Sequence, residues 1–306
     1  MLLQCTVVSR ADLVLESRMR SMPRFILLLA FLLIPRAAFA TWSVVALNSR
    51  TGQSVVASAT CVSGANLERR APPFGLRNIQ AIVVPGKAAA AAQAGVDATF
   101  ANQNLIYAEL QKGTDPAKII EMLSADPAFQ SRQFGIVDLK GRSAGHSGLT
   151  NGYVSQDIHG QVPGTEIFYS IQGNILRPGT VVPNAVQAFL HAKGAITDRV
   201  MAAMEAADGS GGDSRCTCPP WPTDGSKPPI PCDEKTAHVA YILMAEKGDT
   251  SGDSHNNGKY TMYINVAQPG PDHGPNVIHS GENLNPVKTL RMRYDAWRKQ
   301  QPASFK

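Results

Sequence analysis

The pattern of apolar and polar positions first becomes regular at residue 41. From there to residue 47 the side chains alternate between two faces, in the two-residue period of a β-strand. One face carries Thr41, Ser43, Val45 and Leu47, and the other carries Trp42, Val44 and Ala46. Because both faces are largely apolar, the pattern predicts a strand that is covered on both sides. A polar turn at 48–52 and a second β-rich run at 53–60 then predict an antiparallel hairpin.

Apolar runs and helical spacing predict the later elements. Strands are expected at 79–84, 134–139, 167–171, 237–245 and 260–267. Helices are expected at 102–112, from Pro116 behind an Asp115 N-cap, at about 183–193 and 197–207, and from Pro286 to Arg298. The segments 63–78 and 148–165, the second of which contains His159, are expected to be loops. The alanines at 88–92 favour a helix by propensity, although they follow a strand.

The order of these elements predicts the fold class. Strands come first, helices occupy the middle and strands return, which is typical of an α+β fold with sheets layered against helices. The chain beyond residue 40 is long enough to bury one large core. Residues 41–306 are therefore expected to form one domain, with an irregular loop rich in cysteine and proline at 214–236 and a helix at its C-terminal end.

The segment before residue 41 has the pattern of a secretory signal peptide. Its apolar core at 27–34 is too short for a membrane anchor, Arg24 precedes it, and the small-x-small site Ala38-Phe39-Ala40 follows it. Residues 1–21 do not resemble the start of a leader, and we interpret them as an over-long gene start. We therefore expect cleavage after Ala40, a periplasmic or secreted protein, and no stable membrane anchor after cleavage.

Charge excludes one class of partner. The whole chain holds 29 Lys and Arg against 24 Asp and Glu, and five of the former and two of the latter lie in the leader. The remaining chain is nearly balanced, so nothing in its charge indicates a nucleic acid or an anionic membrane as partner. A homo-oligomer is left open.

Four cysteines remain once the leader is removed: Cys61, Cys216, Cys218 and Cys232. An even number in an oxidising compartment favours disulfides over zinc, for which His238 would have to be a fourth ligand. A bond between Cys216 and Cys218 is the least favoured because one residue separates them. We therefore expect Cys232 to bond Cys216 or Cys218. No metal or cofactor is expected, and the polar loop at 246–259 lacks the spacing of a calcium site.

Cleavage after Ala40 would give Thr41 a free α-amine beside its hydroxyl. That pair is a nucleophile with its own base. An α-amine titrates near about 7.7–8.0, so a useful fraction is neutral and can accept the hydroxyl proton. The competing interpretation is that a small polar residue follows the cleavage site by chance.

Several segments, taken in order, resemble the landmarks of the DUF1028 family, which is placed with the N-terminal nucleophile (Ntn) hydrolases and is itself of unknown function. They are 41–46 (TWSVVA), 132–138 (RQFGIVD), 146–148 (HSG), 172–176 (QGNIL) and 211–215 (GGDSR). The resemblance implies an αββα sandwich of two mainly antiparallel sheets between helical layers, with the nucleophile at the start of the first strand. It also implies a strand at 86–93. The family's ordinary members have a short connection in place of the cysteine-rich loop.

Six further residues are candidates for the same site. Asn174 could donate to an oxyanion, and Asp213 with Arg215 could orient the amine or bind a substrate carboxylate. Gln93 and Asn102 flank a strand-to-helix crossing, and Ser58 lies on the second strand. Each also has a structural interpretation, as a turn former, a helix exit or core filler. His146, on the return strand after the turn at 140–142, is a seventh candidate that Ntn chemistry does not require, because the amine is the base.

The leading hypothesis is an exported Ntn-type hydrolase that cleaves an amide or peptide-like bond through an acyl-Thr41 intermediate, with a small-molecule or peptide-like substrate. The alternative is a non-catalytic periplasmic binding or envelope protein on the same fold. Fold alone does not decide between them.

Overall fold

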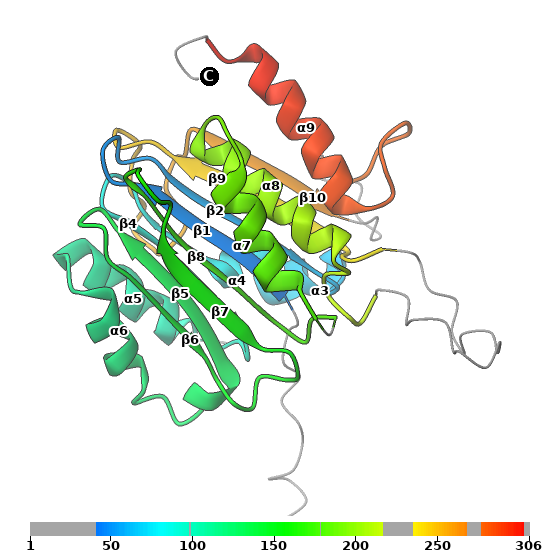
Figure 1. Ribbon diagram of the computed structural model, residues 1–306. Helices are drawn as coiled ribbons and strands as arrows, with labels where there is room; N and C mark the ends of the chain where they lie inside the picture. The colour runs from blue at the N-terminus through cyan, green and yellow to red at the C-terminus, as the bar shows by residue number, and fades with distance from the viewer. Residues whose placement is uncertain (1–40, 98, 178, 217–234, 268–276, 303–306) are drawn as a thin grey trace, which may run out of the picture. The chain divides into compact units, whose positions relative to one another are not determined.

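The computed structural model describes residues 41–97, 99–177, 179–216, 235–267 and 277–302 (Figure 1). The expected leader lies outside these residues, so the signal peptide stays a prediction. Among the described residues, none of the helices combines the length and the apolar character that a membrane crossing requires.

The first of two sheets contains the strand that begins at residue 41. Its strands are β1 (Thr41–Asn48), β2 (Ser54–Thr60), β7 (Gln156–Gln161), β8 (Ile167–Asn174), β9 (Val239–Ala245) and β10 (Met262–Ala267). They lie in the order β10-β9-β2-β1-β8-β7, and every pairing is antiparallel. Strand β1 is thus hydrogen-bonded on both sides, to β2 and to β8, which confirms the predicted hairpin.

The second sheet is smaller and also antiparallel. It contains β3 (Ala81–Val84), β4 (Ala88–Ala94), β5 (Arg132–Asp138) and β6 (Ser143–Ser147), in that order. Together with the helices described in the next paragraph, the two antiparallel sheets confirm a mixed α+β fold.

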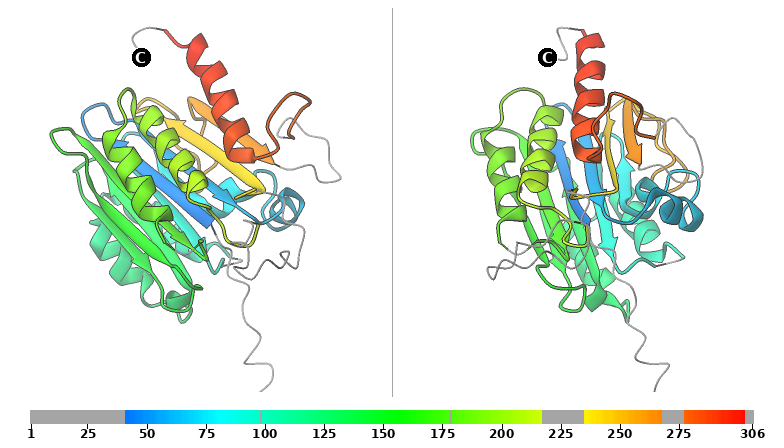
Figure 2. Two further views of the ribbon diagram at one scale, coloured as in Figure 1. Left: turned by 45° about the vertical axis from the view of Figure 1, so that its right-hand side comes forward. Right: turned by 90° about the vertical axis from the view of Figure 1, so that its right-hand side faces the viewer.

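The helices pack in two groups, on opposite sides of the sheets (Figures 1 and 2). Helices α7 (Val181–His191), α8 (Ile196–Gly209) and α9 (Pro286–Gln300) share one apolar core with the first sheet. Helices α5 (Ala101–Lys112) and α6 (Pro116–Leu123) share another with the second sheet. Asp115 caps α6 as expected, since its Oδ1 accepts from the Ala117 amide at 2.9 Å.

A third core fills the space between the sheets and shows that the two faces of β1 were predicted correctly. Val45 and Leu47 lie in this core, whereas Trp42, Val44 and Ala46 lie in the core under α7 and α8. Thr41 has the same parity as Val45, so its side chain faces the second sheet.

The alanine run is a strand, as the resemblance implied and against its propensity. Ala89 and Ala91 face the core between the sheets, while Ala88, Ala90 and Ala92 face α5 and α6. A run that is buried on both faces can pair fully with β3 and β5, and this tertiary packing outweighs helix propensity.

Two segments expected to be loops contain regular structure, and both predictions were wrong. Residues 63–78 contain α3 (Gly64–Arg70) and most of α4 (Leu76–Gln80), two helices too short to show a clear period. Gly75 joins them at φ +54°, where an added Cβ would lie 3.3 Å from the Leu67 side chain. Within 148–165, β7 is an edge strand with His159 on it. Its polar sequence shows no apolar alternation from which a strand could be predicted, because edge strands are often polar.

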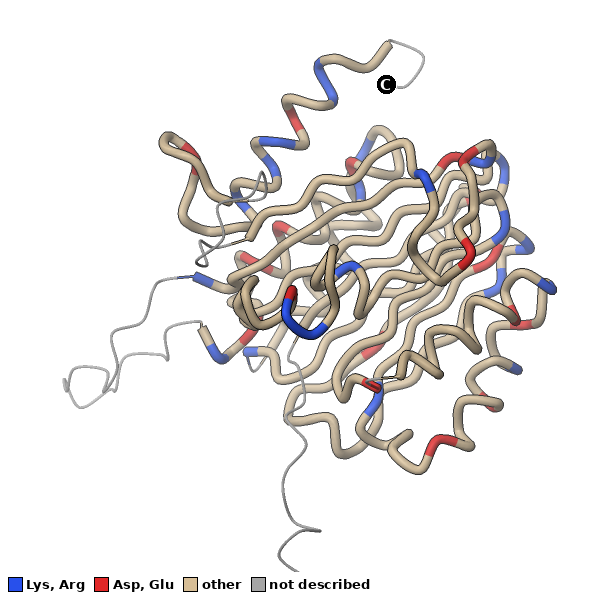
Figure 3. Tube along the Cα trace, turned by 180° about the vertical axis from the view of Figure 1, so that it is seen from behind, with Lys and Arg blue, Asp and Glu red and all other residues tan. Residues whose placement is uncertain are grey.

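Charged residues lie mainly on helices, turns and strand ends, and the strands themselves carry few of them (Figure 3).

In the loop after β9, the Asp249 carboxylate accepts hydrogen bonds from the backbone amides of Glu246 and Thr261 at 2.9 and 2.7 Å. Its carboxylate therefore closes the loop itself.

Candidate functional site around Thr41

Thr41 begins β1, between the last residues of its two neighbouring strands. It pairs directly with Asn174 of β8, and the hairpin register places Thr60 of β2 on its other side. The threonine is 1% exposed. Because residues that pair directly in an antiparallel sheet point to the same face, Thr41, Thr60 and Asn174 all face the second sheet.

The Thr41 hydroxyl lies beside a second threonine. Its Oγ1 donates to Thr60 Oγ1 at 3.3 Å. Thr60 Oγ1 also accepts from the Val62 amide at 3.2 Å and from Arg215 Nη2 at 3.4 Å. Sequence reasoning missed Thr60 and selected Ser58, two residues earlier on the same face. The hairpin register was the signal that could have identified Thr60.

Asp213 and Arg215 do come together near Thr41, as predicted. Asp213 is fully buried and accepts twice from the Arg215 guanidinium, from Nη2 at 2.7 Å and from Nε at 3.1 Å. Its carboxylate also accepts from the Cys61 amide at 2.8 Å. A bridge between Asp213 and Leu176 holds this segment against the chain just beyond β8. The arginine is thus fixed with its charge beside Thr60.

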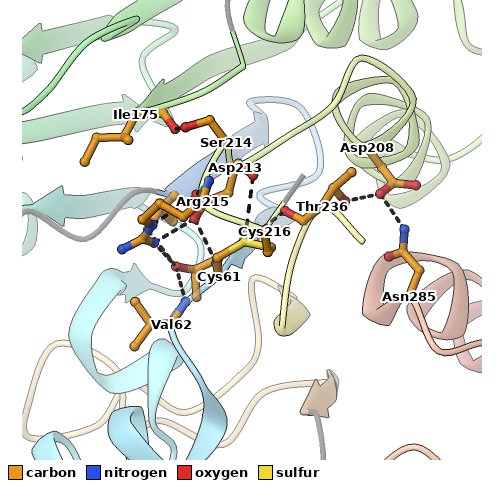
Figure 4. The surroundings of a disulfide bond; sticks show 12 residues. Cys61, Val62, Ile175, Asp208, Asp213, Ser214, Arg215, Cys216, Thr236 and Asn285 are labelled. Carbon is orange, nitrogen blue, oxygen red and sulfur yellow. Dashed lines mark hydrogen bonds and ion pairs between the residues drawn. A yellow bond between two sulfur atoms is a disulfide. The ribbon is translucent and has the colours of Figure 1, made fainter. Parts of the chain in front are cut away.

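A disulfide brackets these residues. Cys61 directly follows Thr60, Cys216 directly follows Arg215, and the two cysteines are bonded with their Cα atoms 5.9 Å apart (Figure 4). The general expectation of disulfide bonding is confirmed, but the expected bond between Cys216 and Cys232 was wrong, because Cys216 is bonded to Cys61. The remaining possibility, Cys218 with Cys232, lies outside the described residues.

The disulfide is itself embedded in hydrogen bonds. Cys61 Sγ lies 3.6 Å from the Thr236 carbonyl, and the Thr236 hydroxyl donates to Asp208, which also accepts from Asn285 Nδ2 at 2.7 Å (Figure 4). Asn285 is the N-cap of α9. A chain of polar contacts therefore runs from the site to the start of the C-terminal helix.

A row of buried glutamines reaches Thr41 from the second sheet. Gln93 Nε2 on β4 donates to the Thr41 carbonyl at 3.0 Å and to Gln133 Oε1 at 2.6 Å. Gln80 Nε2 donates to Gln93 Oε1 at 2.6 Å, and the Tyr241 hydroxyl donates to Gln80 Oε1 at 3.1 Å. Burial raises the pKa of Tyr241 well above its usual value, so the phenol keeps the proton that it donates. Both Gln93 protons are used inside the protein.

Asn174 is fully buried, and one half of its amide has no partner. Its Nδ2 donates to the Asn151 carbonyl at 2.8 Å, and Asn151 Nδ2 donates to the Arg132 carbonyl at 3.1 Å. Asn174 Oδ1 has no hydrogen-bond partner among the described residues. The next residue, Ile175, has a φ of +51°, a conformation that a β-branched residue rarely adopts. A strained backbone with an unsatisfied buried acceptor is typical of a functional position.

A small cavity lies against Thr41. Its volume is about 10 Å³, which is room for about one water molecule. The described residues that line it are Thr41, Thr60, Leu67, Leu76, Ile79, Gln80, Gln93, Ala94 and Val96. Helices α3 and α4 thus supply the apolar wall. A second cavity of similar size is adjacent and shares Gln93 and Val96.

Three of the predicted residues lie away from the Thr41 hydroxyl. Ser58 pairs with Ser43, and its hydroxyl donates to the Trp42 carbonyl at 2.7 Å. Asn102 lines the second cavity, where it donates to Asp126 at 2.7 Å. The half-buried His146 ring stacks at 3.7 Å between centroids on Phe129, which packs against the core under α5 and α6. Within the described residues, His, Cys, Asp and Glu form no group of three that could hold a metal ion.

The fold and the site define an α+β protein with a buried polar site at the start of its central strand. A family model described as "Family of unknown function (DUF1028)" matches residues 41–218, and the chain belongs to this family. The matched region begins at Thr41 and includes Asn174, Asp213 and both bonded cysteines.

Among solved structures, the chain is similar to the crystal structure of protein SPO2555 from Silicibacter pomeroyi, which is assigned to the same family model. The two share 19% sequence identity over 87% of this chain and 94% of that chain, with a TM-score of 0.55. This likeness supports the fold alone. A comparison with curated proteins returns no match.

Proposed function

We propose that this chain is an exported hydrolase of the Ntn type, in which removal of the leader gives Thr41 a free α-amine. Its layers then correspond to the sandwich of that superfamily, with the nucleophile at the start of the first strand. The substrate is an amide or a peptide-like bond. The observation that carries the proposal is that a threonine directly behind a predicted cleavage site is also the buried first residue of the doubly covered central strand.

The reaction proceeds in two balanced steps. Thr41 Oγ1 attacks the carbonyl carbon of the amide, and its proton passes to the α-amine. The C–N bond breaks, the leaving amine takes that proton, and an ester remains on Thr41. Water then attacks the ester and the C–O bond to Thr41 breaks. The Thr41 hydroxyl is regenerated and a carboxylic acid is released.

The neighbouring residues suit this chemistry. The guanidinium of Arg215 lies 3.4 Å from Thr60 Oγ1, next to Thr41, where positive charge favours the negative charge that develops during attack. Asn174 Oδ1 is an unused acceptor on the residue paired with Thr41. We assign it to the new amine, because cleavage at residue 41 adds donors there. Gln93 fixes the Thr41 carbonyl and with it the main chain of the nucleophile.

A non-catalytic binding or envelope protein is the second candidate. The size of the cavity favours it, since about 10 Å³ beside the nucleophile leaves little room for a substrate. This candidate requires no free amine and no reaction at Thr41.

The test compares three forms of the protein that begins at Thr41: the wild type, Thr41→Ala and Thr41→Ser. An electrophilic ester probe is added, and intact mass with peptide mapping locates the label. We expect the wild type to be labelled at Thr41, the serine variant to be labelled in part, and the alanine variant not at all, with all three unfolding alike.

The matched control adds one residue before Thr41. This turns the amine into a non-basic amide while the hydroxyl stays, so labelling should be lost as completely as in Thr41→Ala. Labelling elsewhere, or none in the folded wild type, would favour the binding protein instead.

A further inference from the structure

The cavity beside Thr41 has walls that restrict what it can hold. Leu67, Leu76 and Ile79 are 2–5% exposed and form one apolar side together with Val96 and Ala94. None of the described residues that line the cavity has a titratable side chain. A charged group placed there would lose its hydration, and the nearest charge, the Arg215 guanidinium, is already paired with Asp213. The cavity therefore takes an uncharged group.

The two glutamine amides in the wall already have hydrogen-bond partners within the protein. Gln80 accepts from Tyr241 and donates to Gln93, while the two Gln93 protons go to Gln133 and the Thr41 carbonyl. A ligand that needed hydrogen bonds from these amides would have to break this row. An apolar group does not need them, so apolar contact is the favourable interaction here.

The volume fixes the size of the guest. About 10 Å³ accommodates about one water-sized group, and a methyl group is close to this size. A longer chain would have to displace α3 or α4, whose leucines are packed against the core between the sheets.

The position of the cavity decides which half of a substrate enters it. The acyl half stays bonded to Thr41 through both steps, whereas the amine half must leave before water attacks. A small cavity walled by packed helices suits the half that stays. On another side of the site, the Arg215 side chain is 34% exposed, and Tyr153, whose hydroxyl hydrogen-bonds the neighbouring Ser214, is a 58% exposed residue. That side offers the leaving amine a way out.

We propose that the cavity is an acyl-binding pocket and that the substrates are amines acylated with a short, uncharged group, an acetyl group above all. The proposal rests on the proposed function, because it assumes that Thr41 forms the acyl ester. In that step the acyl carbon bonds to Thr41 Oγ1, the C–N bond breaks, and the amine leaves with the proton of the hydroxyl.

The experiment uses three probes, the p-nitrophenyl esters of acetic, butanoic and hexanoic acid. Each acylates Thr41 with release of p-nitrophenol, and each rate is divided by the rate of the same ester with a small amine in solution. Wild-type protein starting at Thr41 should form the acetyl ester at least about 10-fold faster than the hexanoyl ester, since one methylene in a fitted pocket changes a rate by roughly 10–200-fold.

Two variants enlarge the pocket and one serves as control. Leu76→Ala removes side-chain volume from the wall. Val96→Ala removes less volume and is the second choice if Leu76→Ala does not fold. Either should reduce the preference for acetyl at least about 10-fold. Leu110→Ala is the matched control, because Leu110 is equally buried in the core under α5, away from the cavity. It should lower stability and leave the preference unchanged.

The outcomes separate the two proposals. Equal rates for all three esters at Thr41, or an equal shift in Leu110→Ala, would overturn the acyl pocket and leave the hydrolase intact. No acylation of Thr41 by any ester in folded wild-type protein would overturn both.

Discussion

At the scale of single residues, Gln93 links Thr41 to the second sheet. It is 4% exposed, and its side chain contacts the Thr41 carbonyl, Gln80 and Gln133. A buried polar group without a partner costs about 1–3 kcal/mol. The row of glutamines is therefore stable only while each of its members is present.

Gln93→Leu should lower the free energy of unfolding by about 2–3 kcal/mol, because Gln80 Nε2, Gln133 Oε1 and the Thr41 carbonyl each lose the buried hydrogen bond that Gln93 makes with them. Urea denaturation at neutral pH measures the loss, with an unchanged m-value as the sign that the unfolded state is the same. Gln161→Leu is the control, since this residue is exposed on the edge strand β7 and should change stability by less than about 0.5 kcal/mol. Equal losses in the two variants would contradict the role of the glutamine row.

The sequence predicted some of the residues that lie together at the site and missed others. Thr41, Asn174, Asp213 and Arg215 were expected to act together and do lie together, because three of them follow strand ends or a glycine-rich exit that the pattern reveals. Ser58 was selected in place of Thr60 because both lie on the same face and only the register separates them. His146 is half-buried and stacks on Phe129, a contact between distant parts of the sequence that no local pattern shows.

At the scale of elements, one disulfide joins the end of β2 to the segment that carries Asp213 and Arg215. The two cysteines are separated by 155 residues in the sequence. Closing so long a loop in the unfolded chain removes much of its freedom, so the bond is expected to contribute about 2–5 kcal/mol.

Reduction should therefore destabilise the protein and loosen Arg215. The effect is measured in a Cys218→Ala/Cys232→Ala background, where the bond between Cys61 and Cys216 is the one that a thiol reductant can break. We expect urea denaturation to show a loss of about 2–5 kcal/mol on reduction. Adding Cys61→Ala and Cys216→Ala should give the same loss without reductant and none beyond it. If the urea midpoint were the same with and without the reductant, the bond between Cys61 and Cys216 would be ruled out.

Helix α9 is attached by an ion pair that responds to acid. Arg293 donates to both carboxylate oxygens of Glu282, at 2.6 and 2.7 Å, and also to the Asn265 carbonyl on β10 at 2.9 Å. The hydrogen bonds from Arg293 lower the pKa of Glu282 to about 2 from its usual 4.5. A carboxyl whose folded pKa is depressed stabilises the fold above its unfolded pKa, and this contribution is lost as the pH falls through the folded pKa.

Stability should therefore decline as the pH falls from about 4.5 to about 2, and part of that decline belongs to Glu282. Glu282→Gln should remove about 1 kcal/mol of the acid-dependent loss after solvent screening. Urea denaturation at pH 7 and at pH 3 measures the difference. Glu121→Gln, in an exposed pair with Lys118 on α6, is the control and should leave the loss as it is. Identical acid losses in wild type and Glu282→Gln would refute the assignment.

Elements with a clear period were predictable, and short or uniform ones were not. The faces of β1, the hairpin with β2 and the Asp115 cap of α6 follow from residue patterns that local physics enforces. Helices α3 and α4 have 7 and 5 residues, and prolines and arginines surround them, so no period could develop. Those two helices supply the leucine wall of the cavity. The cavity could therefore not be predicted, although the strand that carries Thr41 was.

At the scale of the molecule, two of the three cores meet at β1, one on each face of the strand. The core between the sheets is apolar at Val45 and Leu47 and becomes polar toward Thr41, where Gln93, Gln133 and Asn174 lie. The apolar part secures the strand, and the polar part is concentrated where a reaction would occur. The proposed reaction depends on cleavage of the peptide bond between Ala40 and Thr41, because Thr41 has a basic amine only as the first residue of a chain.

Export of the full chain should yield a protein that starts at Thr41, which N-terminal sequencing and intact mass measure directly. The small residues Ala38 and Ala40 are what the peptidase requires, so Ala38→Leu with Ala40→Leu should leave the precursor uncut. Ala37→Leu lies one position outside the small-x-small site and should be processed normally. The uncut form keeps the Thr41 hydroxyl but has an amide nitrogen, so an ester probe should not label it. A start even one residue upstream of Thr41 in the exported wild type would remove the base from the proposed reaction, and the hydrolase would have to be abandoned.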